Sequence, residues 1–191
     1  MSPSVFLLAA FSLCGLLGCS LPLVAQPGAP ENAEAPHYDA STLEERVLHE
    51  VNRIREEYAR QPVRLDSNLA TIARAHSLDM RERDFVAHQN PDGAFPGDRA
   101  LRAGYRFREF GENLFRGRLY DVITRSGGGL EERTFYRWHT PDAMAELVVQ
   151  MWLESPGHRE NMLAGRYDYG GVGIVIGQDH YVFITLNLSA R

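Results

Sequence analysis

The sequence predicts a single exported α+β domain. Three features support this prediction: an apolar segment at the N-terminus, helical hydrophobic periodicity through most of the chain, and apolar or alternating segments near its end. Helices followed by a terminal hairpin favour a layered α+β fold over a doubly wound one. The 191 residues suit one domain, and 44% hydrophobic with 24% charged residues is an ordinary globular balance. The net charge of −5, without a basic stripe or an arginine-rich tail, predicts no nucleic-acid partner.

The N-terminus has the features of an export signal. Residues 5–17, VFLLAAFSLCGLL, are almost wholly apolar, and the run is shorter than the about 20 residues that a membrane span needs. At its end, Leu16-Leu17-Gly18-Cys19 resembles the bacterial lipobox, in which the cysteine is lipidated and becomes the new N-terminus. Several acyl chains on one cysteine give stable membrane anchoring. We therefore predict a lipoprotein signal peptide over residues 1–19 and a lipid anchor in the bacterial cell envelope, on the periplasmic or the outer face. The alternative is cleavage near Ala25, although Leu23 is larger than the −3 position prefers.

A linker is expected between the signal and the domain. Residues 20–40, SLPLVAQPGAPENAEAPHYDA, are rich in proline and alanine and have no periodicity, which is typical of a disordered tether. The domain is then expected over residues 41–191. Both cysteines, Cys14 and Cys19, precede it, so the predicted domain contains no disulfide and no thiolate metal site.

Periodicity and capping signals place the helices of the domain. The predicted helices are Thr42–Ala59, Ser67–Arg83, Gly97–Ala103, Pro141–Glu154 and His158–Leu163. Thr42 and Glu45 have the spacing of a capping box, and Asp66 or Ser67 is expected to cap the second helix. The fourth helix is expected to bury Met144, Leu147, Val148, Met151 and Trp152. His76 lies within an apolar stripe, where a histidine is more often a hydrogen-bonded core residue than a ligand.

Strand signals concentrate in two places. Val172–Ile176 and Tyr181–Leu188 flank a short turn and predict an antiparallel hairpin at the end of the chain. Residues 118–139 resemble an insertion, because β-rich segments flank the glycines of residues 127–129. This pattern predicts a second hairpin with a mobile tip.

No compact catalytic signature is present. The chain has no Gly-x-Ser-x-Gly elbow, no His-Glu-x-x-His and no phosphate-binding glycine loop. Three segments instead combine an ionisable residue with turn-forming neighbours: 87–93, 111–114 and 152–163. They carry His88, Glu112 and His158, and we expect these side chains to form a polar cleft.

These segments belong to a longer series of motifs. In chain order the series is Ala73-Arg-Ala-His76-Ser-x-Asp-Met80, Phe85-x-x-His88, Pro91-Asp-Gly93, Arg99-Ala-x-x-Ala-Gly-Tyr105, Gly111-Glu-Asn-Leu114, Trp152 followed by Ser-Pro-Gly-His-Arg, and Gly171-Val-Gly173. Each motif is weak by itself, but the complete ordered series resembles the CAP superfamily, also called the SCP domain, and its bacterial branch in particular. The resemblance covers roughly Leu43 to Leu188, most of the domain.

The resemblance implies a three-layer α-β-α sandwich with a large cleft. In the family, two histidines and two acidic residues line that cleft. His88 and His158 match the histidines, and Glu112 matches the first acid. The position of the second acid is filled here by Ser155, so the resemblance predicts a triad in place of a tetrad.

Two imidazoles and a carboxylate make a reasonable site for a divalent cation such as Zn²⁺, with an open position for water. The predicted metal ligands are His88, Glu112 and His158, with Asn113 and Ser155 as supporting residues behind them. The alternative is purely structural: both histidines hydrogen-bond Glu112 and hold three loops together. The residues by themselves leave these two interpretations open.

Two functions are therefore weighed. The first is a ligand- or metal-binding module that the N-terminal lipid holds at the membrane. Its ligand would be an envelope component or, by analogy with eukaryotic relatives that bind sterols or fatty acids, a hydrophobic small molecule. The second is a hydrolase, a protease or an esterase, that uses a Zn²⁺-bound water or Ser155 with a histidine as base. Its catalytic set would be His88, Glu112, Ser155 and His158. Because no catalytic motif is present and the tetrad is incomplete, we favour binding over catalysis.

Overall fold

A computed structural model describes residues 35–126 and 132–191. The helices are α1 (Ala40–Glu57), α2 (Ser67–Glu82), α3 (Pro96–Arg102), α4 (Pro141–Glu154) and α5 (Pro156–Leu163). The strands are β1 (Arg64–Leu65), β2 (Glu109–Arg118), β3 (Tyr120–Ser126), β4 (Glu132–Trp138), β5 (Tyr169–Ile176) and β6 (Tyr181–Ala190). The signal peptide that we predict, with Cys19, lies outside the described residues. Within them, no helix has the length and apolar character required to cross a bilayer.

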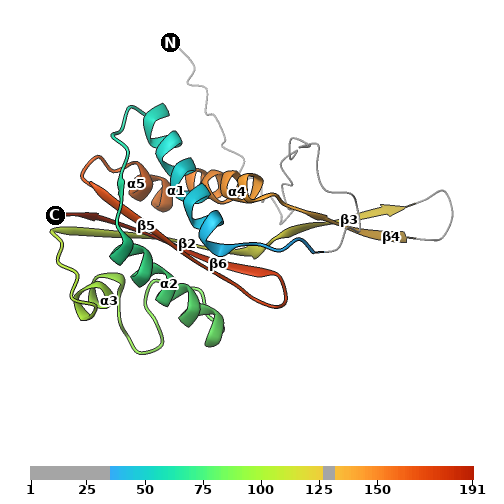
Figure 1. The fold of residues 1–191 in the computed structure, drawn as a ribbon, viewed down its shortest axis with the longest axis horizontal. Coiled ribbons are helices and arrows are strands. Elements are labelled where there is room, and N and C mark those ends of the chain that lie inside the picture. Colours follow the sequence, from blue (N-terminus) through green and yellow to red (C-terminus); the bar gives the residue numbers. More distant parts are fainter. Residues whose placement is uncertain (1–34, 127–131) are drawn as a thin grey trace, which may run out of the picture.

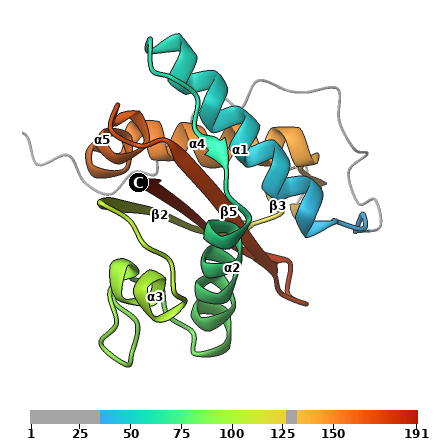
Figure 2. The same ribbon diagram turned by 60° about the vertical axis from the view of Figure 1, so that its left-hand side comes forward.

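The domain has three layers, as the resemblance implied. A central sheet has the strand order β1-β5-β6-β2, with β1 parallel to β5 and the other neighbours antiparallel. Helices α1, α4 and α5 lie on one side of this sheet, and α2 and α3 lie on the other (Figure 1). Figure 2 shows the same separation of the helices from a second direction. The fold is therefore the predicted α+β sandwich.

Each of the helices α1, α2 and α4 begins at a single side chain that caps it. Asp66, one of the two expected caps, caps α2, and Thr140 caps α4. The predicted start of the first helix is wrong: α1 begins at Ala40, where the carboxylate of Asp39 accepts hydrogen bonds from the backbone N–H groups of Ser41 and Thr42. Thr42 thus lies inside the first turn, because an aspartate three residues earlier satisfies the free N–H groups.

Strand β2 was not predicted, and its burial explains why. Four consecutive residues, from Glu112 to Phe115, are buried, because helices cover both faces of the sheet. A strand that is buried on both faces has no alternating pattern. The strand pairs along its whole length with β6, from Glu109 opposite Ala190 to Arg118 opposite Tyr181. It therefore forms one edge of the central sheet and carries Glu112 into the interior.

Helix α2 approaches β5 very closely. A Cβ atom at Gly173 would collide with the backbone of α2 at Ala73 and Arg74. The side chain of Ser77 on α2 then reaches the carbonyl of Gly173 at 2.8 Å and the hydroxyl of Thr185 on β6 at 2.9 Å. This close packing fixes the position of α2, and with it His76, relative to the sheet.

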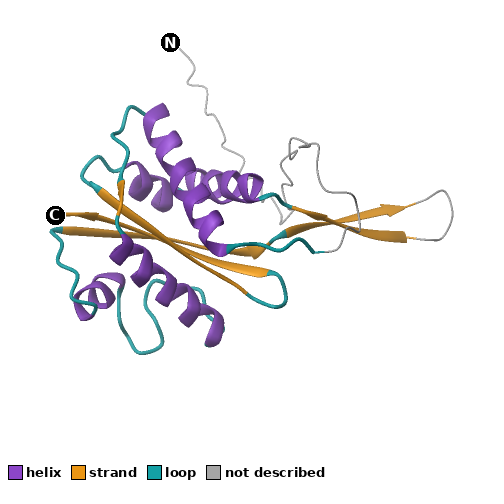
Figure 3. Cartoon of the chain, in the orientation of Figure 1, coloured by secondary structure: helices purple, strands orange, loops and turns teal. Residues whose placement is uncertain are grey.

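The predicted hairpin is present as a separate two-stranded sheet of β3 and β4. The strands pair antiparallel from Tyr120 opposite Trp138 to Ser126 opposite Glu132. This hairpin extends away from the three-layer body (Figure 3). Its tip, residues 127–131, where we predict mobility, lies outside the described residues.

Two expectations about packing need correction. Met151, which was expected in the core, is 50% exposed, and Val149 is buried in its place. The buried face of α4 thus includes Val149 and leaves out Met151, unlike the predicted stripe. In addition, Tyr38 belongs to the predicted linker, yet it packs against the main core and its hydroxyl donates to the carbonyl of His139. The last residues of that linker are therefore part of the folded domain.

Candidate functional site

One cleft of about 420 Å³ is lined by the three side chains that the sequence analysis singled out, His88, Glu112 and His158. His88 comes from the loop after α2, Glu112 from β2 and His158 from the first turn of α5. Ser155, at the junction of α4 and α5, lines the same cleft. Its other lining residues are Gly157, Glu160, Asn161 and Arg166. Segments more than 60 residues apart are thus brought together at one end of the sheet.

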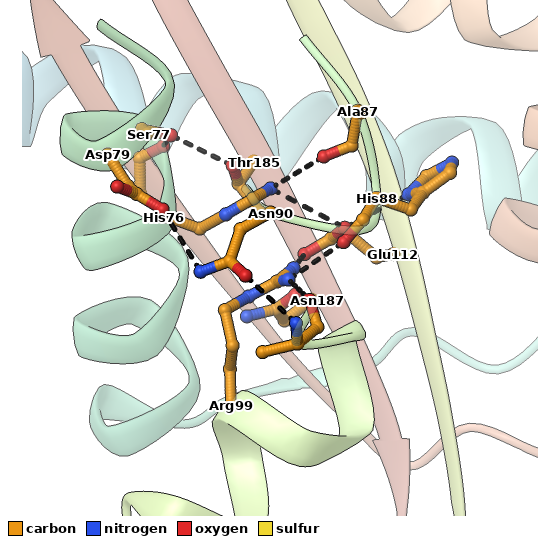
Figure 4. A network of polar contacts seen from close by, with 12 residues as sticks. His76, Ser77, Asp79, Ala87, His88, Asn90, Arg99, Glu112, Thr185 and Asn187 are labelled. Carbon is orange, nitrogen blue, oxygen red and sulfur yellow. Dashed lines mark hydrogen bonds and ion pairs between the residues drawn. The ribbon is translucent and has the colours of Figure 1, made fainter. Parts of the chain in front are cut away.

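Glu112 forms the buried floor of this cleft. Its side chain is only 2% exposed, and both of its oxygens have partners. Oε1 accepts a hydrogen bond from Nδ1 of His88 at 2.9 Å, and Oε2 accepts one from the Arg99 guanidinium at 2.6 Å (Figure 4). A buried carboxylate is costly unless it is paired and hydrogen-bonded. Arg99 supplies the balancing positive charge.

This contact defines the chemistry of His88. Because the carboxylate can only accept, Nδ1 of His88 carries the proton, and in the neutral ring Nε2 keeps its lone pair. The His88 side chain is 50% exposed and lines the cleft. A carboxylate behind a histidine in this way fixes the orientation and the tautomer of the ring.

His158 faces His88 across the cleft. The two ring centroids are 6.5 Å apart and the rings are inclined at 62°. Burial lowers the pKa of the His158 imidazole, and the nearby His88 lowers it further. The neutral form of His158 is thereby favoured, which leaves a nitrogen lone pair available for a ligand.

A chain of side-chain hydrogen bonds holds α5, and thus His158, against β2. The amide of Asn113 donates to the carbonyl of His158 at 3.0 Å, and that of Asn161 donates to the Asn113 side-chain oxygen at 2.9 Å. The hydroxyl of Tyr167 then donates to Asn161 at 3.1 Å. A Cβ atom at Gly111 would collide with the side chains of Asn161 and Tyr167. The glycine of the Gly111–Leu114 motif is thus required for this contact between α5 and β2.

Sequence reasoning assigned no role to Arg99. From α3 its guanidinium also donates to the carbonyls of His88 at 2.7 Å and Ala94 at 3.0 Å, in addition to its ion pair with Glu112. It therefore holds the His88 loop and the Glu112 carboxylate together. Arg99 is in the motif series, but nothing in its spacing indicates that α3 delivers it to a buried acid on β2.

His76 is a core histidine, as its apolar surroundings predict, and it lies beside the same acid. Its side chain is fully buried, with Nε2 at 3.1 Å from the Ala87 carbonyl oxygen and 3.9 Å from Glu112 Oε1. Burial lowers its pKa, although the charge of Glu112 acts in the opposite direction.

Glu160 and Arg166, which also line the cleft, were not predicted either; Arg166 pairs with Glu109 at 2.5 Å.

The side chains available as ligands decide whether a cation fits the cleft. Among residues 35–126 and 132–191, no group of three or more His, Cys, Asp or Glu side chains is arranged to hold a metal ion. Both Glu112 oxygens are engaged by His88 and Arg99, so Glu112 is not placed as a direct ligand. The remaining donors are the two imidazoles, with Glu112 behind His88; their ring centroids, 6.5 Å apart, would have to approach for both to bind one cation. Metal binding itself stays a prediction.

Comparison with known proteins identifies the class. The profile of the CAP, or cysteine-rich secretory protein, family matches residues 48–188. The uncharacterized protein YkwD of Bacillus subtilis is 30% identical over 135 residues, 71% of this chain and 43% of that protein. The uncharacterized membrane protein YlbC of the same organism is 27% identical over 134 residues, 70% of this chain and 32% of its own length. The chain therefore spans less than half of the length of these two relatives.

Solved structures share the fold. An extracellular protein containing an SCP domain from Bacillus anthracis has a TM-score of 0.58 at 23% identity, covering 83% of this chain and 45% of that one. An outer surface protein from Borrelia burgdorferi has a TM-score of 0.63 at 18% identity, covering 81% of this chain and 96% of its own. A cysteine-rich secretory protein from Staphylococcus aureus has a TM-score of 0.55 at 17% identity, covering 83% and 42%. The chain belongs to the CAP family.

Proposed function

We propose that this protein is a binding module of the bacterial cell envelope, and that its cleft holds a divalent cation such as Zn²⁺ through His88 and His158. One observation carries the proposal: the buried Glu112 fixes Nδ1 of His88 at 2.9 Å, which leaves Nε2 of this half-exposed ring for a ligand. His158 supplies the second imidazole, and Glu112 acts as the orienting carboxylate and not as a third ligand.

The surroundings support a polar site. The lining includes Glu160, Asn161 and Arg166 in addition to the imidazoles. A cation bound by two imidazoles supplies a Lewis acid with open positions for oxygen donors of a ligand. The residues of this chain would then orient the ring of His88, keep His158 neutral and present Asn161 and Arg166 to polar groups of that ligand.

Zinc calorimetry on the purified protein tests the cation. His88→Ala and His158→Ala should each weaken zinc binding at least about tenfold, because each removes one of two donors. His49→Ala is the matched control, since His49 is an exposed histidine on α1 outside the cleft. Equal zinc affinity in all four proteins would exclude the cleft as the site. Glu112→Gln should weaken binding less than loss of either imidazole does.

The location in the envelope rests on the N-terminal sequence. The apolar run and Cys19 favour export and lipidation, and the two similar proteins described as extracellular and as an outer surface protein are consistent with export. Cys19→Ser should release the protein from the membrane fraction and abolish incorporation of labelled palmitate. Unchanged membrane retention would contradict a lipid anchor at Cys19.

Hydrolysis is the weaker alternative. Within the described residues, no hydrogen bond joins Ser155 to either cleft histidine, and Ser155 makes no side-chain bond to the start of α5. A nucleophile needs a base within hydrogen-bond reach. A screen with peptide and ester substrates tests this alternative, and turnover that disappears in both Ser155→Ala and His158→Ala would revive it.

A further inference from the structure

The β3–β4 hairpin has two faces of different chemistry. Directly opposite residues of two antiparallel strands lie on the same side of the sheet, and the side alternates along each strand. By this register, one face carries Tyr120, Val122, Tyr136 and Trp138, whereas Asp121 and Arg137 lie on the other. We call the first of these the aromatic face. The acid and the base of the opposite face form an ion pair at 2.6 Å, so their charges balance there.

The base of the aromatic face is fixed to the folded body. Trp138 belongs to the main core, and Tyr120 packs against that core. The ring of Tyr120 contacts those of Trp138 and Tyr136, with centroids 5.0 Å and 5.1 Å apart. Arg118, the last residue of β2, holds its guanidinium carbon 5.7 Å from the centroid of the Tyr120 ring. A continuous surface therefore runs from the end of β2 onto the hairpin, with an exposed cation at its base.

The outer part of the aromatic face is exposed. Val122 and Tyr136 lie opposite each other and are 47% and 43% exposed, because the hairpin extends beyond the layers of the body (Figure 3). Aromatic side chains with a polar group are enriched where hydrocarbon meets water, since the ring is apolar and the polar group stays wet. Glu132, the acid of this face, is at the end farthest from Arg118. The composition near the base thus fits a surface that is apolar beneath anionic groups.

The polypeptide enters the domain beside the base of the hairpin. The hydroxyl of Tyr38 donates to the carbonyl of His139, directly after β4, and lies 3.4 Å from that of Leu119, directly before β3. Figure 1 shows the start of the described chain, in blue, next to the origin of the two strands. Eighteen residues separate Cys19 from Tyr38, and they span at most about 65 Å when fully extended. A lipid at Cys19 would keep the hairpin base within this distance of the bilayer.

We propose that the aromatic face docks on the phospholipid membrane that carries the lipid anchor. Val122 and Tyr136 enter the interfacial layer, and Arg118 contacts lipid phosphates while its apolar stem stays near the Tyr120 ring. The proposal rests on the anchor at Cys19, which is part of the proposed function. A tether makes the second contact an intramolecular event at high effective concentration, so a few interfacial side chains suffice. The domain is then held in one orientation and does not rotate freely on its linker.

Quenching by brominated phosphatidylglycerol measures this contact directly. The full chain carries Tyr136→Trp or, as the matched control, Tyr58→Trp, because Tyr58 is 46% exposed at the end of α1 far from the tether. Each protein is reconstituted into vesicles, and the signal of the native tryptophans is subtracted with the unaltered protein. Tyr136→Trp should be quenched at least about twofold more than Tyr58→Trp, because only the first lies in the interfacial layer. Equal quenching of the two proteins overturns the proposal.

Two pairs of variants, each made in the Tyr136→Trp protein, test which side chains carry the docking. Val122→Asp should lower the quenching, whereas Val86→Asp should not, since Val86 is similarly exposed (46%) in the loop after α2. Arg118→Glu should lower it as well, whereas Arg108→Glu should not, since Arg108 is an exposed arginine before the opposite end of β2. Equal effects within either pair overturn the proposal.

The same samples separate this proposal from the proposed function. Sedimentation with the vesicles reports the anchor, so a protein that sediments without quenching of Tyr136→Trp keeps its anchor and overturns the docking. Zinc binding should be unchanged in the hairpin variants, because none of the substituted hairpin residues lines the cleft. An emission of Tyr136→Trp that shifts with protein concentration before vesicles are added shows that a second copy covers this face, which also overturns the proposal.

Discussion

The two histidines beside Glu112 have opposite environments and therefore different roles. His88 is 50% exposed and donates to the carboxylate at 2.9 Å, whereas His76 is fully buried and stays 3.9 Å from the same oxygen. The exposed ring can offer a nitrogen to a ligand in solution. The buried ring, whose pKa is lowered by desolvation, contributes to packing beside Glu112. Burial, and not residue type, thus separates the imidazole that we propose for ligand binding from the structural one.

Removal of Arg99 should have the largest effect on this arrangement. Arg99→Met leaves Glu112 buried without its cation, and loss of one partner of a buried ion pair costs about 3–5 kcal/mol. Denaturant unfolding measures the loss. The control Arg83→Met removes an exposed ion pair, for which little or no loss of stability is expected. Similar losses in the two variants would show that Arg99 does not stabilise Glu112.

A moderate effect is expected on the cleft side of Glu112. Gly111→Ala would push Asn161 and Tyr167 away from β2, and overpacking of this kind costs about 1–3 kcal/mol. Because Asn161 and Asn113 hold His158, zinc affinity should fall together with stability. Gly165→Ala is the matched control, since Gly165 does not line the cleft and a Cβ there makes only an ordinary van der Waals contact, with Arg60 at 3.7 Å. Unchanged zinc affinity in Gly111→Ala would show that metal binding does not depend on the position of α5.

The smallest effect is expected on the pH dependence of stability. A histidine in an unfolded chain titrates near about pH 6.5, and burial lowers the pKa of folded His76 below that value. The unfolded chain therefore binds more protons as the pH falls, so the stabilisation is complete above about pH 6.5 and is lost below it. His139, whose pKa burial also lowers, acts in the same direction.

His76→Gln should reduce the fall in unfolding free energy between pH 7 and pH 5, and the double variant with His139→Gln should reduce it further. Urea unfolding at a series of pH values measures these slopes. A slope in His76→Gln equal to that of the unaltered protein would contradict a buried, neutral His76.

Only some residues of the site could be predicted from the local sequence. His88, Glu112 and His158 each lie in a short segment with turn-forming neighbours, and all three line the cleft. Arg99 has no such signal, because its function depends on the packing of α3 against β2. Strand β2 was missed for a related reason: helices on both faces of the sheet remove the alternating pattern.

The sequence by itself determined the α+β class, the approximate helices, both hairpins and the segments that carry the cleft residues. These follow from periodicity and capping, which are local properties. Only the tertiary structure decided that Glu112 is held by Arg99 on one side and His88 on the other, and that His76 lies behind it. Such assignments depend on burial and on distances between segments far apart in the chain, and no local pattern encodes either quantity.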